Sequence, residues 1–149
     1  MIRVAVAVAQ EAVEVDRGRM RRVARAVLEG EGVGEAEVSL AFVDSPTIQR
    51  LNQRYLGHDE PTDVLSFPLG EPCARKLTGE LVLGAEVAKA QADSRGHDAQ
   101  AELALYVIHG LLHLCGLDDK TAVGAAAMRQ RERHYLTLLG LPDIAPAGE

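Results

Sequence analysis

Two histidines four residues apart, His109 and His113, end an apolar segment that reads AELALYVIHGLLHLCGL. A helix turns about 100° per residue, so these imidazoles lie roughly 40° apart on one face and can reach the same metal ion. Gly116 follows where a left-handed turn can end the helix, and two carboxylates, Asp118 and Asp119, come next. The pattern HxxxHxxGxxD therefore predicts a metal site with three protein ligands, which is typical of catalytic zinc.

Two further side chains of this segment could act at the site. Cys115 is a soft metal ligand, but it projects roughly 160° away from His113, so we interpret it as a small buried residue. Glu102 lies two turns before His109 on the same face, where it could orient a metal-binding imidazole. The alternative for Glu102 is an ordinary carboxylate in the first turn of a helix. The other histidines stand in polar contexts and are expected to face solvent: His58, His97 and His134.

The residue after the first histidine separates this site from a common class of zinc enzyme. The pattern resembles the HExxHxxGxx(H/D) site of zinc peptidases, in which a glutamate activates the metal-bound water. Here that position is Gly110, which has no side chain to act as a base. The motif therefore predicts metal binding and argues against metallopeptidase chemistry.

The composition is that of a reduced globular protein. A chain of 149 residues with 47% hydrophobic and 26% charged residues is expected to form one domain over 1–149. Its two cysteines, Cys73 and Cys115, do not make a disulfide framework. No apolar run reaches the roughly 18 residues of a membrane span, and the first residues lack the order of a signal peptide. We therefore expect a cytoplasmic protein with no membrane partner.

The charge of the chain is negative overall but has one basic segment. A net charge of −6 argues against a nucleic-acid binder that relies on overall positive charge. Five arginines stand between Arg17 and Arg25, however, and they could form a local basic surface. We prefer to interpret them as a solvated helix face; the alternative is a surface that touches RNA or a ribosomal partner.

The elements that must position these residues follow from apolar periodicity. Alternation and turn signals predict four strands, over residues 2–9, 36–44, 63–69 and 79–84, with the segment EPCARKLTG as a loop. Apolar stripes predict five helices, over residues 17–29, 45–57, 85–96, 98–115 and 121–139, the first capped by Asp16 and the second by Ser45. The short connection between the third and fourth strands makes them antiparallel. The expected fold is α+β: a mixed sheet of roughly four strands, about five packed helices, and the metal site at the end of the central apolar helix.

Two long motifs, taken together, resemble one protein family. The segment LNQRYLGHDEPTDVLSFP, residues 51–68, resembles the LNxxYRxxDxPTDVLSFP segment of the YbeY family of bacterial ribosomal-RNA maturation endoribonucleases. HGLLHLCGLDD matches the HGxLHLxGxDH motif of that family at every marked position except the last. TGELVLGAEVAKAQA and the closing MRQRERHYLTLLG are also similar to family segments, in the right order.

The resemblance implies a metal-dependent endoribonuclease that acts on ribosomal RNA, in maturation of the 3′ end of the small-subunit RNA and in ribosome quality control. The implied partners are the small ribosomal subunit, ribosomal proteins and an assembly GTPase. The family holds its metal, usually taken as zinc, with three histidines of the second motif. Carried over by position, the ligands of one Zn²⁺ ion are His109, His113 and Asp119, and the catalytic residues are His109, His113 and Asp118.

Two positions depart from the family pattern. The third histidine is Asp119 here; a carboxylate is a sound zinc ligand but makes the ion a weaker Lewis acid. Because Asp118 stands beside it, either carboxylate could be the third ligand. The arginine that follows the tyrosine in the family is Leu56 here, which cannot contact phosphate. Two polar side chains are candidate substrate contacts: Arg54, which points elsewhere on its helix than residue 56, and Ser66, for which a satisfied strand hydroxyl is the equal alternative.

These departures leave two other functions open. A metal-binding ribosome assembly factor with little hydrolytic activity would need neither the arginine nor the third histidine. A metallopeptidase is the weaker alternative, because Gly110 stands where its base would be.

Overall fold

Four strands form one mixed sheet at the centre of the fold. The computed structural model describes residues 1–71 and 75–146. The strands are β1 (Ile2–Ala9), β2 (Glu35–Val43), β3 (Val64–Pro68) and β4 (Lys76–Gly84), and their order across the sheet is β1-β2-β4-β3. β1 and β4 pair in parallel with β2, whereas β3 pairs antiparallel with β4. The predicted mixed sheet, with its antiparallel third and fourth strands, is confirmed.

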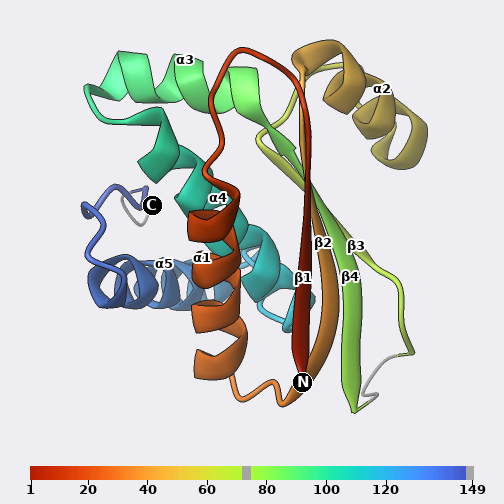
Figure 1. Ribbon diagram of the computed structural model, residues 1–149, viewed down its shortest axis with the longest axis vertical. Helices are drawn as coiled ribbons and strands as arrows, with labels where there is room; N and C mark the ends of the chain where they lie inside the picture. The colour runs from red at the N-terminus through yellow and green to blue at the C-terminus, as the bar shows by residue number, and fades with distance from the viewer. Residues whose placement is uncertain (72–74, 147–149) are drawn as a thin grey trace.

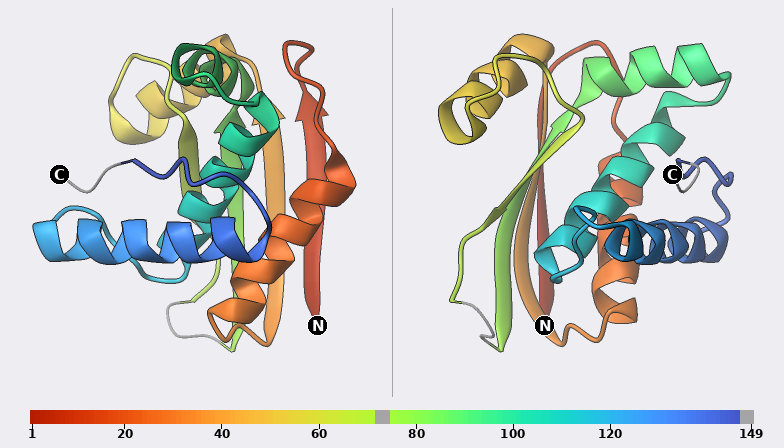
Figure 2. Two further views of the ribbon diagram at one scale, coloured as in Figure 1. Left: turned by 90° about the vertical axis from the view of Figure 1, so that its left-hand side faces the viewer. Right: turned by 180° about the vertical axis from the view of Figure 1, so that it is seen from behind.

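Five helices surround this sheet. They are α1 (Arg17–Gly30), α2 (Ser45–Leu56), α3 (Ala85–Arg95), α4 (Ala99–Leu114) and α5 (Ala122–Leu138). α1, α4 and α5 lie on one side of the sheet and α2 on the other (Figure 1, Figure 2). α4 is central, because it contacts α1, α3, α5, β3 and β4. The predicted α+β class is confirmed. None of the helices in the described residues is long and apolar enough to cross a bilayer.

The main hydrophobic core lies between α4 and the sheet. Every residue of α4 from Ala101 to Leu112 is buried except His109. These side chains join Leu40 of β2 and Leu81 of β4 in one buried cluster. A helix that is apolar on nearly all sides is held by its neighbours rather than by solvent. The helix that carries the two histidines is therefore fixed in position before any ligand binds.

Gly110 allows α4 to lie close against the sheet. A Cβ atom at this position would stand 2.9 Å from a methyl carbon of Leu81 and 3.0 Å from one of Val64. Only a residue without a side chain permits this approach. The position that holds the catalytic glutamate in zinc peptidases therefore faces the sheet in this chain.

Two predicted element boundaries are wrong, for different reasons. Asp44, not Ser45, caps α2, since its carboxylate accepts a hydrogen bond from the backbone N–H of Thr47 at 3.0 Å. β4 begins at Lys76, inside the segment expected to be a loop, because residues 76–79 pair with residues 35–38 of β2. Long-range pairing has lengthened a strand that local sequence does not mark. Cys73, in the same segment, lies outside the described residues.

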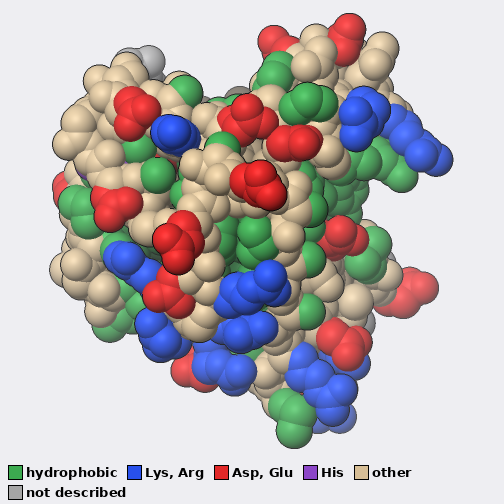
Figure 3. Space-filling model, turned by 45° about the horizontal axis from the view of Figure 1, so that its top comes forward, with side chains coloured by type: hydrophobic (Ala, Val, Ile, Leu, Met, Phe, Trp, Pro, Cys, Tyr) green, Lys and Arg blue, Asp and Glu red, His purple; other side chains and the backbone are tan. Residues whose placement is uncertain are grey.

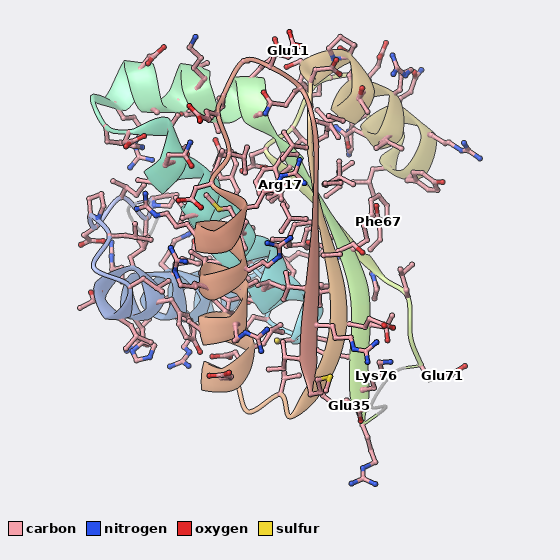
Figure 4. The ribbon with its side chains drawn as sticks, in the orientation of Figure 1. Glu11, Arg17, Glu35, Phe67, Glu71 and Lys76 are labelled. Atoms are coloured by element: carbon pink, nitrogen blue, oxygen red, sulfur yellow. The ribbon has the colours of Figure 1, made fainter. Side chains whose placement is uncertain are left out.

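Two arginines of α1 cover the open edge of the sheet. Arg17 donates a hydrogen bond to the carbonyl of Val6 at 3.0 Å, and Arg21 to that of Val4 at 3.3 Å. Figure 4 shows Arg17 between the start of α1 and β1. β1 is an edge strand, whose unpaired carbonyls would otherwise be open to pairing with another chain. Figure 3 shows basic side chains gathered in the lower half of the surface that it views. Contact between the arginines of α1 and RNA stays a prediction.

Candidate metal centre

The end of α4 and the loop after it bring two imidazoles and one carboxylate together. Nε2 of His109 and Nε2 of His113 are 3.0 Å apart. Asp119 places Oδ2 at 3.7 Å from Nε2 of His109 and Oδ1 at 3.7 Å from Nε2 of His113. The ligand atoms of all three lie within 4.8 Å of one another. The structure thus gathers the three residues that the sequence predicts as metal ligands.

A tight turn after α4 selects Asp119 over Asp118. Gly116 has a φ of 101°, a left-handed conformation that glycine adopts without strain, as predicted. The N–H of Leu117 then bonds to the carbonyl of Leu112 at 3.0 Å, so the chain folds back over the helix end. The carboxylate of Asp118 is exposed and accepts the backbone N–H of Lys120 at 2.8 Å. Asp118 therefore holds the loop, and Asp119 faces the histidines.

The spacing of the three ligand atoms fits a small divalent ion. Ligands about 2.0–2.1 Å from a tetrahedral ion lie roughly 3.3 Å from one another. The two imidazole nitrogens are 3.0 Å apart, and each lies 3.7 Å from the nearer oxygen of Asp119, so these distances fall on either side of that value. Imidazole nitrogen and carboxylate oxygen are also donors that zinc accepts. These residues could hold a metal and leave a coordination position for water or substrate.

Two features favour the protonation state that a metal requires. Burial, and then repulsion from His109, lower the pKa of His113, and the opposing attraction of Asp119 does not reverse this. Only the neutral imidazole binds a metal. In addition, Nδ1 of His109 lies 3.6 Å from Oε1 of Glu132. A carboxylate there favours a proton on Nδ1 and leaves Nε2 for the ion.

Glu132 of α5 is a buried carboxylate beside His109 that the sequence reasoning missed. Its side chain is 0% exposed, although it carries a charge. Arg129, one turn earlier, donates to both carboxylate oxygens, with Nη1 at 2.7 Å from Oε2. Nη2 of Arg129 also lies 3.8 Å from Oδ2 of Asp119. α5 therefore adds one buried ion pair to the two histidines of α4 and the carboxylate of the loop.

One signal in the sequence could have revealed Glu132. It shares a buried face of α5 with Met128, Tyr135 and Leu136. A carboxylate on an apolar face costs free energy unless a charged or hydrogen-bonding partner meets it. An acidic residue at an apolar position of a helix is therefore a candidate for a buried functional pair.

The metal centre opens into a cleft of about 490 Å³. Its lining includes residues 61–63 before β3, Gln91 and Arg95 of α3, and Tyr106 and His109 of α4. Burial, followed by the charge of Glu102, raises the pKa of Tyr106, so its hydroxyl keeps its proton at neutral pH. The cleft offers both hydrogen-bond donors and carboxylates to a polar ligand, next to the ligand atoms.

Glu102 lines the same cleft but bonds to other partners. Its Oε1 lies 2.5 Å from Nε2 of His97 and 3.7 Å from Nη1 of Arg95. The carboxylate near His109 is that of Glu132. The prediction that His97 faces solvent is wrong, since its side chain is only 12% exposed. A buried carboxylate needs a hydrogen-bond donor, and His97 supplies one. The other two histidines expected in solvent are exposed: His58 and His134.

The two predicted substrate contacts do not line this cleft. The hydroxyl of Ser66 donates to the carbonyl of Gly110 at 3.3 Å and so ties β3 to α4. The guanidinium of Arg54 lies 5.3 Å from the ring centre of Tyr55, at the exposed end of α2. Tyr55 packs edge-on against Phe67, with ring centres 5.3 Å apart. Phe67 points to the side of the sheet away from α4 (Figure 4).

Cys115 lies apart from the metal ligands, as its helical angle predicts. It lines a separate cavity together with Leu114 and Gly116. Burial raises the pKa of its thiol to about 11. A thiol that keeps its proton is a poor metal ligand and a poor nucleophile.

The fold and the site together fit a hydrolytic metalloenzyme: an α+β core with two histidines and one carboxylate that could hold a metal ion beside a cleft. The family model of Endoribonuclease YbeY matches residues 5–140. The chain therefore belongs to the YbeY family of endoribonucleases, as its two motifs predicted, and by class it is a hydrolytic nuclease.

Curated relatives agree with this assignment, and a solved structure agrees with the fold. The Endoribonuclease YbeY of Moorella thermoacetica is 44% identical over 133 residues, which cover 82% of this chain and 85% of that protein. That of Pelotomaculum thermopropionicum is 44% identical over 131 residues, which cover 83% and 86%. A solution structure of a Thermotoga maritima protein superposes with a TM-score of 0.62 over 99% of this chain and 100% of that one, at 24% identity. This last likeness supports the fold alone.

Proposed function

We propose that the chain is a single metal-dependent endoribonuclease domain that processes ribosomal RNA in the cytoplasm. The observation that carries the proposal is the group of His109, His113 and Asp119 at the end of α4, in a chain whose relatives are named Endoribonuclease YbeY. The proposed roles are maturation of the 3′ end of the small-subunit RNA and ribosome quality control. The proposed partners are the small subunit, ribosomal proteins and an assembly GTPase.

The proposed cofactor is one Zn²⁺ ion held by these three residues. Bound there, zinc would polarise a phosphate oxygen or lower the pKa of a water molecule. The chain's own residues orient the site. His109 and His113 present Nε2 from one helix face, and Glu132 favours the proton on Nδ1 of His109. Asp118 holds the loop that carries Asp119 through its bond to Lys120.

The residues proposed for the substrate act at different distances from the centre. Arg54 is exposed at the end of α2, where its guanidinium can contact an RNA backbone beyond the cleft. Ser66 supports the site indirectly, since its hydroxyl is bonded to the carbonyl of Gly110. The acidic residues of the cleft make RNA binding there depend on a bound cation.

A second candidate is a metal-binding ribosome assembly factor with little hydrolytic activity. One observation favours it. The family motif has arginine at the position of Leu56, which is 58% exposed and carries no charge. The packing of Gly110 against Leu81 and Val64 argues against the metallopeptidase alternative, because it leaves no space for a base.

The decisive experiment measures cleavage of a small-subunit rRNA precursor by protein of verified metal content. The matched variants are His113→Ala, which removes a ligand, and His134→Ala, which removes an exposed histidine of α5. Cleavage by the wild type and by His134→Ala, lost in His113→Ala and after treatment with a chelator, is the expected result. Cleaved RNA is read on a gel, and metal content by elemental analysis.

A metal-loaded wild type that leaves the RNA intact would overturn the endoribonuclease proposal. Complementation of a strain lacking its own family member then tests the second candidate. Full rescue of growth and rRNA processing by His113→Ala is the result that favours assembly without chemistry.

A further inference from the structure

The cleft beside the metal ligands is acidic, although the proposed substrate is a polyanion. Among the described residues, its charged lining consists of four carboxylates and two guanidiniums: Asp63, Glu102, Asp119, Glu132, Arg95 and Arg129. Of the two cations, Arg95 pairs with Glu102 at 3.7 Å and donates to the carbonyl of Ile144 at 2.7 Å. Arg129 is the cation that stands next to the metal ligands. The phosphate of an RNA strand at the metal centre would meet Arg129 before any other cation of this lining.

Arg129 is held firmly in this position. Nη1 bonds to both oxygens of Glu132, whose side chain is 0% exposed, and Nη2 lies 3.8 Å from Oδ2 of Asp119. The Arg129 side chain itself is 17% exposed, so part of it stays open to the cleft. A guanidinium has five N–H donors. Because Nη1 serves Glu132, donors on the remaining nitrogens are available for an anion that enters the cleft.

The local charge explains when an anion would be attracted. The carboxylates of Asp119 and Glu132 and the guanidinium of Arg129 carry one net negative charge together. A divalent ion bound by the histidines and Asp119 would change this sum to one net positive charge. An ion would also draw on the carboxylate of Asp119 and weaken its hold on Nη2. RNA should therefore bind at this point only when the ion is present.

We propose that Arg129 contacts the RNA phosphate at the metal centre and is a catalytic residue of this chain. The inference rests on the proposed endoribonuclease function and names the residue that receives the substrate there. A planar guanidinium fixed by a buried carboxylate is suited to two parallel hydrogen bonds with a phosphate. Such a contact positions the phosphate and stabilises charge that develops on it.

The competing interpretation is that Arg129 only neutralises the buried Glu132. The two differ in one measurable respect. A positive charge near the ligands opposes the binding of a metal cation, so removing it should leave Zn²⁺ affinity unchanged or higher. Removing a phosphate contact should weaken RNA binding. A purely structural arginine predicts loss of both, since the unpaired Glu132 would disturb His109.

The test compares Arg129→Met and Arg129→Lys with Arg133→Met, a matched control. Arg133 is exposed one turn further along α5 and pairs with Asp143 at 3.5 Å. A fluorescein-labelled 20-nucleotide single-stranded RNA is the probe, in a fully 2′-O-methyl form whose intactness is checked on a gel. Anisotropy gives its affinity for the Zn²⁺-loaded proteins over a range of salt concentrations, and a competing chelator dye gives Zn²⁺ affinity. Cleavage kinetics use the unmodified RNA.

Arg129→Met should bind the probe on the order of 10- to 100-fold more weakly. Its salt slope should be shallower by about 0.7, the value for one phosphate contact on a single strand. Zn²⁺ affinity should be maintained, Arg129→Lys should recover part of the binding, and Arg133→Met should match the wild type. Wild-type binding should disappear without Zn²⁺.

Unchanged RNA affinity and salt slope in Zn²⁺-loaded Arg129→Met would overturn the inference. Loss of both Zn²⁺ binding and RNA binding in Arg129→Met calls for the double variant Arg129→Met/Glu132→Gln, which leaves no unpaired buried charge. Recovery of Zn²⁺ binding without RNA binding in the double variant supports the inference. Any other result of the double variant overturns it. Because binding is read separately from cleavage, failure of the endoribonuclease proposal appears as bound but uncut RNA. Failure of the Arg129 contact appears as unchanged binding.

Discussion

At the scale of single residues, Asp118 and Asp119 show how a turn gives adjacent carboxylates different roles. The left-handed Gly116 and the bond from Leu117 to Leu112 return the chain over the end of α4. One carboxylate then points into the loop and the other toward the imidazoles. In an extended chain these two side chains would also point to opposite sides, because successive side chains alternate along a strand. Which aspartate faces the imidazoles therefore depends on the backbone and not on the chemistry of aspartate.

Replacing these two aspartates one at a time tests this division of roles. Asp119→Asn should lower Zn²⁺ affinity, because it removes a charged oxygen from the ligand set. The loss should be at least about 10- to 100-fold, the range typical of losing a residue that hydrogen-bonds to a metal ligand. Asp118→Asn should leave Zn²⁺ affinity unchanged, since an asparagine oxygen can still accept the Lys120 N–H. Competition with a chromophoric chelator at pH 7 measures both. The reverse order of effects would make Asp118 the third ligand.

Local rules predicted the three residues that the structure brings together, but not the residues packed around them. The histidine pair and Gly116 follow from helical spacing and from the conformational freedom of glycine. Glu132 and Arg129 come from a different helix: Glu132 lies 19 residues after His113, and Arg129 lies 10 residues after Asp119. Nothing in the spacing of α5 says that its face meets the end of α4. That information lies in the packing of the two helices.

At the scale of elements, the function depends on how closely α4 lies on the sheet. Gly110→Ala places a methyl group at 2.9 Å from Leu81, a fully buried residue that cannot move aside freely. We expect a loss of about 1–3 kcal/mol in the free energy of unfolding, the usual cost of overpacking a core. Gly18→Ala is the control, because its Cβ would make only ordinary contacts, the nearest at 3.5 Å.

Urea denaturation of both variants measures this difference. Gly18→Ala should be as stable as the wild type or slightly more stable, since alanine favours a helix. Gly110→Ala should also bind Zn²⁺ more weakly, because a displaced α4 moves both histidines relative to the loop. Equal stability of the two variants would show that α4 has room above β4, which contradicts the packing described here.

The elements themselves were largely predictable, because apolar periodicity in the sequence matches burial in the structure. The alternation in residues 2–9 coincides with β1, and Asp16 caps α1 as predicted. The errors arise where two local signals compete or where a partner decides. Asp44 and Ser45 are both good capping residues, and Lys76 joins β4 only because β2 lies beside it.

At the scale of the whole molecule, one polar cluster connects the end of α1 with α5, the first and last helices of the described chain. Glu31, directly after α1, accepts hydrogen bonds from Tyr135 and Arg131 of α5, the latter from Nε at 3.1 Å. Arg131 also donates to the hydroxyl of Tyr135 at 3.0 Å. Gly30 makes room for the tyrosine ring, since a Cβ there would stand 2.6 Å from it. This cluster holds α5, and with it Glu132 and Arg129, at its place beside α4.

The stability of this cluster should depend on pH through Glu31. Burial would raise the pKa of this carboxyl, but the hydrogen bonds from Tyr135 and Arg131 outweigh burial and hold the pKa below its usual value. A folded-state pKa below the unfolded value stabilises the protein above the unfolded pKa, and the stabilisation is lost as pH falls through the folded pKa. Glu31→Gln should therefore lower the free energy of unfolding by about 1–2 kcal/mol at pH 7. This difference from the wild type should shrink as pH falls below about 4.

Urea denaturation between pH 7 and pH 3.5 measures the difference in the free energy of unfolding. The control is Glu29→Gln, which changes an exposed residue of the same helix turn. A difference that is constant over this range would mean that Glu31 acts through the shape of its side chain and not through its charge.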